Sequence, residues 1–528
     1  MEPNRSAHWA DQTADRIIAE WGDRDSYTCA SGITPSGTVH VGNFREMISV
    51  DLVVRALRRL GKKVRFIYSW DDYDVFRKVP LNMPKQDELS AYLRFPITMV
   101  PDPWDRDESY ARHHEVDVET VLPTVGIHPE FIRQADRYRA GTYAEGMRRA
   151  LEMRDLLKIT LDKYRDEDHK IQGEWWPVSV FCSACNRDTT AIDGWDGDWG
   201  LSYHCDSCGH KETGDLHTLK GAKLVWRVDW PMRWSYEKVD FEPAGKDHHS
   251  QGGSFDTSKH VVEEVYGRKP PVTFRYDFIG IKGSPGKMSS SKGKVVDLPD
   301  LLRVYQPEIV RYLFAGTRPN TEFVISFDLD VIKIYEDYDR TERIYWGADK
   351  AKDADTEARE RRIYELSQVD EVPAEAPYQV PFRHLSSLLL IHQGDIDAVL
   401  ASLPGLKPSQ VGHVRSRAER AWYWVNECAP EEFRFTVSEP GRKAELSPTE
   451  TEAVRHLRDD VVARLETFAD EKAVAEAIYA AATAAGTDGK TLFRAAYQAL
   501  VGKDQGPRLA GFLVTLGKDK VAGILAPY

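Results

Sequence analysis

The chain has 528 residues, of which 41% are hydrophobic and 29% charged, as in soluble globular proteins. This length predicts about two to four domains. No apolar run reaches membrane-spanning length, and the opening Met1 to Ser6 lacks the apolar core of a signal peptide, so we expect a cytoplasmic protein with no membrane partner. The net charge of −13 excludes a uniformly basic nucleic-acid binder but leaves room for local basic tracks.

The first chemical signal is a Gly-rich turn between two predicted strands. Tyr27–Ser31 and Lys63–Trp70 read as strands, and apolar periodicity between them predicts a helix. In such a doubly wound unit, His40, Gly42 and Asn43 lie at a helix N-terminus on the carboxyl edge of a parallel sheet. Backbone N–H groups and the helix dipole attract phosphate there, and the two side chains add donors. A surface histidine in an ordinary turn is the alternative.

Farther along, four of the six cysteines form two Cys-x2-Cys pairs separated by 19 residues, namely Cys182, Cys185, Cys205 and Cys208. This spacing predicts a zinc ribbon with four thiolate ligands. Four protein ligands leave no open position for water, so the zinc is expected to be structural. Disulfides or redox use are the weaker alternative in a cytosolic chain.

A second loop rich in Gly, Lys and Ser follows a predicted strand at Thr273–Ile279. Lys287 and Lys292 on this loop could reach a triphosphate and stabilise the charge of departing pyrophosphate. A solvated basic loop is the alternative. Together with His40 and Asn43, the loop predicts a single ATP site.

The remainder of the chain predicts helices. Leu298–Phe314 reads as two short helices and Ile332–Trp346 as another, followed by a charged exposed stretch at Lys350–Pro377. From Thr449 onward, apolar residues at helical spacing predict a bundle. Nothing in this part specifies chemistry.

At this point the motifs resemble a known family. His40-Val-Gly-Asn43 resembles the HIGH element, and the segment from Lys287 to Lys292 the KMSKS element, of class I aminoacyl-tRNA synthetases, in the expected order and about 250 residues apart. Four further segments closely resemble the class I lysyl-tRNA synthetases of archaea and some bacteria: Trp9–Gln12, Ala30–Thr34, Trp226–Trp234 and Gly245–Thr257. The resemblance covers essentially residues 1–330. Ser290 and Ser291 depart from the second element, so only its two lysines carry over.

The resemblance implies an α/β fold with a Rossmann-like catalytic domain at 1–300. An insertion at about 105–220 would hold a helical stretch from about Tyr110 to Lys163 and the zinc ribbon at 178–216. A helical connecting region at 301–375 and a helical anticodon-binding domain at 376–528 would follow. The implied reaction is ATP-dependent ligation of lysine to tRNA(Lys) through lysyl-adenylate, with Mg²⁺ accompanying ATP, and we expect the protein to act as a monomer.

Residue roles follow from the resemblance together with the needs of the substrate, since a lysine ammonium requires an acceptor and its stem an apolar wall. The expected catalytic residues are His40, Asn43, Lys287 and Lys292, and the expected ATP contacts are Gly42, Ser289, Asp247, Gly252 and Gly253. The expected lysine contacts are Gly32, Thr34, Asp72, Trp226, Asp229, Trp230, His248 and Tyr276, with Asp71 as a further acidic candidate.

Three alternatives stay open. A glutamyl-type class I synthetase would share both ATP elements, and Arg233 could serve a carboxylate substrate. A non-catalytic RNA-binding paralogue would usually have lost the catalytic histidine or lysines. An unrelated zinc-containing nucleotidyltransferase would not depend on RNA.

Overall fold

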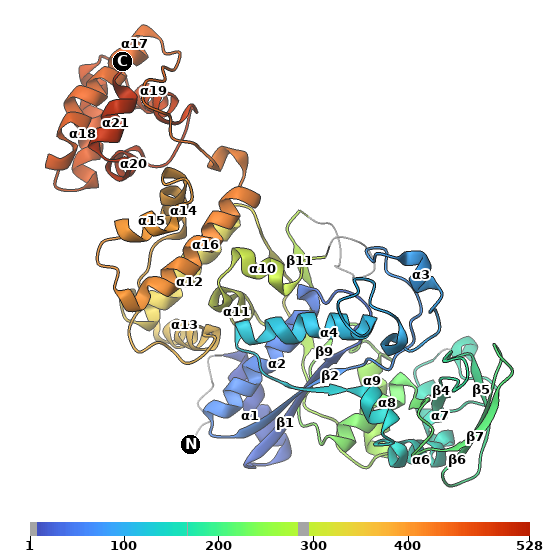
Figure 1. Ribbon diagram of the computed structural model, residues 1–528. Helices are drawn as coiled ribbons and strands as arrows, with labels where there is room; N and C mark the ends of the chain where they lie inside the picture. The colour runs from blue at the N-terminus through green and yellow to red at the C-terminus, as the bar shows by residue number, and fades with distance from the viewer. Residues whose placement is uncertain (1–7, 166, 284–294) are drawn as a thin grey trace. The chain divides into compact units, whose positions relative to one another are not determined.

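The computed structural model describes residues 8–165, 167–283 and 295–528 (Figure 1). The chain divides into two compact units. The first comprises Met1–Leu302, Pro307–Ile325 and Thr341–Val372, and the second comprises Arg303–Gln306, Ser326–Arg340 and Pro373–Tyr528. No helix in the described ranges is both long enough and apolar enough to cross a membrane.

The first unit is built on a parallel sheet. β1 (Ser26–Ile33) pairs along its whole length with β2 (Lys63–Trp70), so that Ile33 lies opposite Trp70. β2 pairs on its other side with β3 (Glu130–Arg133).

On the opposite edge, β1 pairs through Cys29 with Phe241, on the segment that ends in β9 (Ala244–Gly245). That segment pairs in turn with the segment ending in β10 (Arg275–Tyr276). All these pairings are parallel. Across the sheet the strands follow the order β3, β2, β1, the strand ending in β9, and the strand ending in β10. In a doubly wound sheet of this order, the crevice beyond the carboxyl ends of the first and fourth strands is where ligands bind.

One sequence expectation fails inside the sheet. The stretch from Tyr110 to Lys163 contains the expected helices, α4 (Tyr110–Val121), α5 (Gln134–Arg139), α6 (Ala144–Glu152) and α7 (Arg154–Asp162), but also β3. The expectation that this stretch is helical is therefore wrong at Glu130–Arg133. Four residues are too few to show strand alternation, and only pairing with β2 makes this segment a strand.

Helices cover both faces of the sheet. α1 (Trp9–Trp21) contacts α2 (Val41–Arg59), and α2 packs on β1 and β2. On the opposite face, α8 (Trp226–Tyr236) and α9 (Ser254–Glu264) form one apolar cluster with the sheet. That cluster contains Ala30, Ile67 and Ile132 of the sheet and Trp230, Trp234 and Phe255 of the helices. Ser31 follows Ala30 and therefore points to the α2 face.

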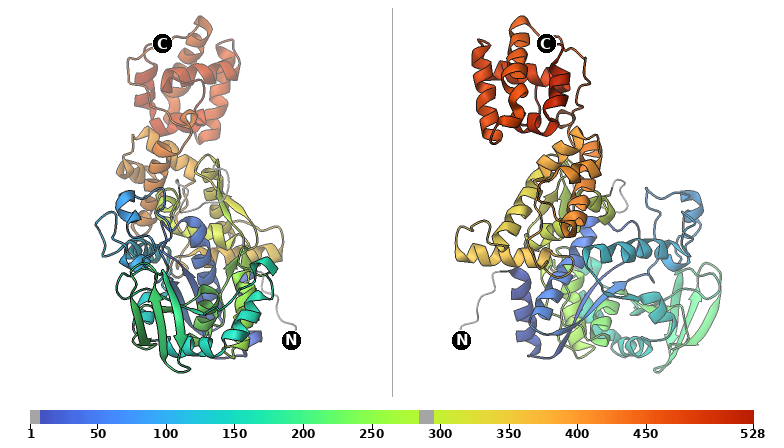
Figure 2. Two further views of the ribbon diagram at one scale, coloured as in Figure 1. Left: turned by 90° about the vertical axis from the view of Figure 1, so that its right-hand side faces the viewer. Right: turned by 60° about the vertical axis from the view of Figure 1, so that its left-hand side comes forward.

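The cysteine-rich lobe is a small antiparallel sheet of β5 (Thr190–Trp195), β6 (Gly200–Cys205) and β7 (Lys211–Asp215) (Figure 2). The chain enters through β4 (Val178–Val180) and leaves through β8 (Ala222–Leu224), which pair with one another. β8 leads within two residues into α8.

The second unit is helical, as expected for the C-terminal part of the chain. Its helices include α14 (Phe382–Ile391), α15 (Ile396–Ser402), α16 (Val411–Glu427), α17 (Pro448–His456), α18 (Glu471–Ala484), α19 (Gly489–Val501), α20 (Leu509–Leu516) and α21 (Lys518–Leu525). Buried Arg417 of α16 forms an ion pair with Asp339 at 2.8 Å.

Buried Arg45 ties the start of α2 to the strands that follow the sheet, β11 (Ile279–Ile281) and β12 (Phe323–Ile325). It is 2% exposed. Its guanidinium donates to four backbone carbonyls, of Asp277 at 2.7 Å, Phe278 at 3.2 Å, Arg318 at 3.1 Å and Thr321 at 2.8 Å. Through these bonds Arg45 joins the four carbonyls to α2. Removal of the guanidinium therefore leaves several acceptors unsatisfied.

Arg45→Leu is expected to lower the free energy of unfolding of the first unit by about 3 kcal/mol. Urea titration followed by tryptophan fluorescence measures the change. Lys269→Leu is the control, because Lys269 is 62% exposed and pairs with Glu20 at the surface, where loss of a pair costs under about 1 kcal/mol. Equal losses in the two variants would contradict the assigned role of Arg45.

Candidate active site

The first predicted ATP element caps α2. His40 is the N-cap residue, and its Nδ1 accepts a hydrogen bond from the Gly42 N–H at 3.1 Å. The Asn43 carboxamide oxygen accepts from the His40 N–H at 3.2 Å, which completes a capping box. Because Nδ1 is the acceptor, the neutral ring carries its proton on Nε2. The acceptor atoms thus stabilise the helix, while the Asn43 amide group and His40 Nε2 supply donors at the helix dipole's positive end.

The segment after the second ATP element returns to the same place. The Val296 carbonyl accepts from the Val41 N–H at 2.9 Å, and Asp297 pairs with His40 as an antiparallel bridge. Lys287, Ser289 and Lys292 lie outside the described residues. The described chain stops at Gly283, just after β11, and resumes at Val295, beside the N-terminus of α2.

The predicted adenine turn opens α9 after β9. Gly252 has φ +70°, and a Cβ on Gly253 would lie 2.4 Å from the His248 carbonyl oxygen. The turn is also held by the Ser250 hydroxyl, which donates to the Asp247 carbonyl at 2.7 Å. The chain's own packing therefore accounts for both glycines, and their helix N-terminus faces the carboxyl edge of the sheet.

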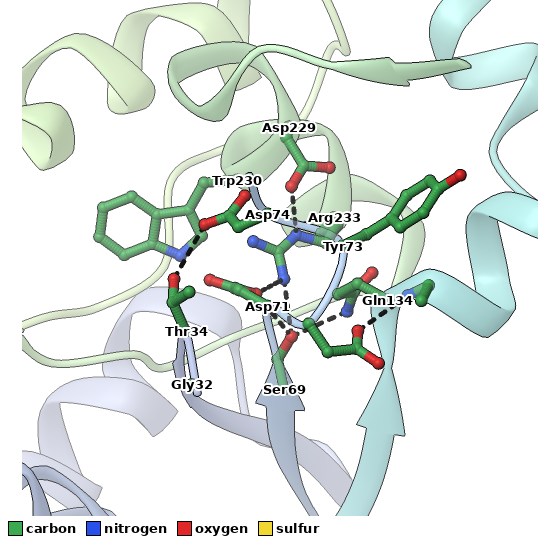
Figure 3. A network of polar contacts seen from close by, with 12 residues as sticks. Gly32, Thr34, Ser69, Asp71, Tyr73, Asp74, Gln134, Asp229, Trp230 and Arg233 are labelled. Atoms are coloured by element: carbon green, nitrogen blue, oxygen red, sulfur yellow. Dashed lines mark hydrogen bonds and ion pairs between the residues drawn. The ribbon is translucent and has the colours of Figure 1, made fainter. Parts of the chain in front are cut away.

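A buried arginine joins two of the candidate aspartates (Figure 3). Arg233 Nη1 donates to Asp71 Oδ1 and to the Ser69 hydroxyl, both at 2.6 Å, and Nε lies 3.3 Å from Asp229 Oδ2. The Tyr138 hydroxyl donates to the other Asp229 oxygen. Burial alone lowers the pKa of a guanidinium, but the two carboxylates raise the pKa of Arg233 well above its usual range. Arg233 is therefore a cation shared by two carboxylates, and its Nη2 lacks a hydrogen-bond partner in the described part of the chain.

A second ion pair holds Thr34. The Thr34 hydroxyl donates to Asp74 Oδ2 at 2.9 Å (Figure 3). The Lys223 ammonium donates to Asp74 Oδ1 at 2.8 Å and to the Tyr73 carbonyl at 2.9 Å. Burial raises the pKa of Asp74, but the ammonium and the two hydrogen bonds outweigh it and hold the pKa below its usual value. Asp74 is thus ionised and already paired.

Asp72 lies apart from this network. Its Oδ1 accepts from the Ala135 N–H at 2.8 Å. It lines a polar cavity of about 420 Å³ with Thr98, Glu108, Ser109, Arg112, Glu115, Arg133, Asp136 and Arg139. Burial and the nearby Glu115 raise the pKa of Asp72 to about 8. No contact of the described residues joins Asp72 to Thr34 or Asp229.

The predicted aromatic residues do come together. Trp226 stacks on Trp230 with ring centroids 5.1 Å apart, and the His248 ring meets Trp230 edge to face at 5.8 Å. The Trp230 indole donates to Glu242 Oε1 at 3.0 Å, and the Trp234 indole donates to Glu242 Oε2 at 2.6 Å. Glu242, on the segment leading to β9, therefore sets the position of this aromatic wall.

Glu46 joins two other predicted lysine contacts. Its Oε1 accepts from the Ser31 hydroxyl at 3.0 Å and from the Gly32 N–H at 3.2 Å, and its Oε2 accepts from the Tyr276 hydroxyl. Burial raises the pKa of Glu46, against the effect of these hydrogen bonds. This carboxylate on α2 thus connects the ends of β1 and β10.

The four cysteines of the ribbon converge. Cys182 Sγ lies 3.7 Å from Cys208 Sγ, and Cys185 Sγ lies 3.6 Å from Cys205 Sγ. A disulfide needs about 2.05 Å. Four sulfurs about 2.3 Å from one ion form a tetrahedron with edges of about 3.8 Å, so the geometry fits four thiolates around zinc. The two knuckles match: residues after each pair, Asn186 and Gly209, have φ +61° and +71° and donate to the carbonyls of the first cysteines.

A further group of potential ligands was not anticipated from sequence. Asp102, Asp107 and His113 bring one ligand atom each within 4.8 Å, as do His113, His114 and Asp117. The exposed Trp104 ring stacks on His113 with centroids 4.1 Å apart. These side chains lie at the start of α4 and in the loop before it.

Comparison with known proteins identifies the family. The sequence model of the family described as tRNA synthetases class I (K) matches residues 7–370. The chain belongs to this family. It is 56% identical to the lysine–tRNA ligase of Treponema pallidum, covering 99% of both chains. It is 49% identical to that of Borreliella burgdorferi, covering 99% of this chain and 100% of the relative, and 42% identical to that of Thermococcus kodakarensis, covering 97% and 98%.

The match confirms the resemblance to class I lysyl-tRNA synthetases. Within this class I synthetase, sequence reasoning missed Glu46, Asp74, Lys223 and Glu242. A signal existed for Glu46, since it is an acidic residue in the first turns of α2, three residues after the predicted Asn43. For Lys223 there was none, because 149 residues separate it from Asp74.

Glu242 gives this synthetase a pH-dependent stability. Burial and the Glu46 charge raise the pKa of Glu242 to about 7, whereas an unfolded glutamate has a pKa of about 4.3. Since the folded state binds the proton more tightly, the stabilisation is complete below about pH 4.3 and is lost as the pH rises through about 7. The free energy of unfolding of the natural chain, relative to Glu242→Gln, is expected to fall by about 3 kcal/mol from about pH 4 to pH 8. Urea unfolding over this range measures it, and a constant difference would contradict the buried titration.

Proposed function

We propose that this chain ligates lysine to tRNA(Lys) with ATP through a lysyl-adenylate intermediate. The observation that carries the proposal is the 56% identity, over 99% of both chains, to a protein named lysine–tRNA ligase. The predicted His40 and Asn43 at the N-terminus of α2 support it, because they place donors where a triphosphate binds.

In the proposed reaction, the lysine carboxylate attacks the α-phosphate of ATP, which enters as its Mg²⁺ complex. His40 and Asn43 contact the phosphates, and Lys287 and Lys292 neutralise the departing pyrophosphate. The terminal ribose hydroxyl of tRNA then takes the lysyl group. No covalent bond to the protein forms, so positioning and charge neutralisation provide the catalysis.

The roles of the remaining ATP contacts are part of the proposal. Gly42 and Ser289 belong to the two phosphate-binding elements, and the Gly252-Gly253 turn lets adenine approach the backbone. Asp247 and His248 lie at the entrance to that turn, near the ribose or the amino acid. The turn that opens α9 supports this placement, since its N-cap residue is Gly253 and no side chain caps the helix.

The charges at the sheet edge favour lysine over glutamate. Among the described residues, Asp71, Asp74 and Asp229 form ion pairs with two cations, Arg233 and Lys223, so these five side chains carry one more carboxylate than cation. A substrate with a carboxylate side chain would add a second uncompensated negative charge. Arg233 is shared by two carboxylates and brings no net positive charge to a ligand. Thr34 and the Trp226–Trp230 pair next to this network are the proposed contacts to the amino acid.

The helical second unit is the proposed anticodon-binding part. The insertion at about 105–220, which includes the cysteine-rich lobe, is the proposed site for the acceptor end of tRNA. The protein is proposed to act as a monomer in the cytoplasm.

The decisive measurement is ATP–pyrophosphate exchange over all twenty amino acids, with and without tRNA. Lysine is expected to support exchange, and glutamate is not. Exchange with glutamate alone would support a glutamyl-type enzyme, and no exchange under any condition would support the non-catalytic paralogue.

The zinc proposal has its own test. The four thiolates would hold the ion, whose role is to crosslink the two knuckles of the lobe. Cys208→Ser is expected to lower zinc retained after desalting by about one ion per chain and to lower the melting temperature. Cys428→Ser, outside the cluster, is the matched control and should change neither. Equal zinc content in both variants would refute a four-cysteine site.

A further inference from the structure

Lys223 lies at the base of the cysteine-rich lobe. It is the middle residue of β8 and pairs with Ser179 of β4. Its neighbours Ala222 and Leu224 are buried in the apolar cluster of the lobe. Because side chains alternate along a strand, that of Lys223 points to the other face of β8, where it is only 12% exposed. A cationic side chain is thus directed from the lobe toward the sheet edge.

The Lys223 ammonium binds the segment that follows β2. It donates to Asp74 Oδ1 at 2.8 Å and to the Tyr73 carbonyl at 2.9 Å. The lobe also holds the side chain of Tyr73. The Tyr73 hydroxyl donates to the Lys220 carbonyl at 2.6 Å, and its ring centroid lies 5.2 Å from that of Phe181, which follows β4. The base of the lobe therefore fixes the position of Asp74.

Asp74 in turn sets the orientation of the Thr34 hydroxyl. Asp74 Oδ2 accepts from Thr34 Oγ1 at 2.9 Å (Figure 3). A hydroxyl has one proton to donate and two lone pairs that accept. Because an ionised carboxylate can only accept, the Thr34 proton is directed to Asp74, and the lone pairs of the oxygen are left for a ligand. Thr34 therefore presents an acceptor, which suits the N–H groups of an ammonium and not a carboxylate.

The charge of Lys223 maintains this arrangement. Burial lowers the pKa of an ammonium, but Asp74 and Asp229 raise the pKa of Lys223 above its usual value, so the cation persists. Without it, the Asp74 carboxylate loses its counter-ion and takes up a proton or turns toward solvent. Either change frees the Thr34 hydroxyl to rotate.

We propose that Lys223 is a positioning residue for the amino-acid site: through Asp74 it orients the Thr34 hydroxyl as an acceptor for an ammonium group of lysine. The inference rests on the proposed function, in which Thr34 contacts lysine. Lys223 acts through Asp74, because its ammonium is directed to Asp74 and to the Tyr73 carbonyl. The base of the cysteine-rich lobe thus takes part in amino-acid binding.

The test is ATP–pyrophosphate exchange with tRNA present, in a double-mutant cycle of Lys223→Met and Thr34→Val. The first change removes the charge and keeps most of the stem, and the second removes the hydroxyl and keeps the shape. Each alone is expected to raise the KM for lysine about 5- to 10-fold, the effect of one oriented hydrogen bond, with the KM for ATP unchanged. In the Thr34→Val background, Lys223→Met should add less than about twofold.

A merely structural role of Lys223 gives a different result. A lobe that packs poorly lowers the fraction of active enzyme, so the rate of exchange falls equally in both backgrounds and the KM for lysine stays the same. Active-site titration measures that fraction. Lys223→Arg retains the charge and should keep the KM for lysine within about threefold of that of the natural chain. A KM as high as that of Lys223→Met would overturn the proposal.

Lys220→Met is the matched control, because Lys220 lies just before β8 and its side chain is exposed. It should leave both KM values unchanged. Lys223→Gln, neutral but polar, covers the case in which Lys223→Met does not fold, and the same non-additive increase is expected. An unchanged KM for lysine in the folded variant, or effects of Lys223 and Thr34 that multiply, would overturn the proposal. Absence of lysine-dependent exchange in the natural chain would instead refute the proposed function.

Discussion

The parallel pairing of β1 with a neighbour on each side is the constraint on which the rest of the first unit depends. β1 is in register with β2 over its full length and meets the fourth strand at Phe241. Because the strand order reverses there, the helices that follow β1 and β9 start at one edge but leave to opposite faces. The N-termini of α2 and α9 therefore lie at the same edge of the sheet. Arg45 then fixes α2 to the strand that leads into the second ATP loop.

Charge pairing determines what this crevice can accept. Acidic residues gather at the carboxyl edge, and an ion removed from water must find a partner or change its protonation. Arg233 and Lys223 satisfy three aspartates and thereby hold the ends of β2 and α8 together. Glu46 and Glu242 accept hydrogen bonds from neutral donors among the described residues, and these donors include Gly32 and Trp230, two predicted contacts to the amino acid.

The cysteine-rich lobe is connected to the same pocket. Lys223 is the middle residue of β8, which pairs with β4 at the base of the lobe and continues directly into α8. Its ammonium reaches Asp74 and so supports Thr34. A crosslink between the two cysteine knuckles would restrain these strands. The base of the lobe therefore helps to hold Asp74 and Thr34 in position.

Much of this was available from the sequence alone. Cysteine spacing, the strand, turn and helix around His40, and the helical C-terminal region are local patterns, set by residues near one another in the chain, and the motif resemblance to class I lysyl-tRNA synthetases rests on such segments. Tertiary structure decided the rest. β3 is a strand only through pairing, Asp72 is adjacent to Asp71 in sequence yet faces another cavity, and Asp74 finds its cation 149 residues away. The sequence offered Asp71, Asp72 and Asp229 as acidic candidates, but which acidic residues are neutralised depends on distances between side chains that folding alone brings together.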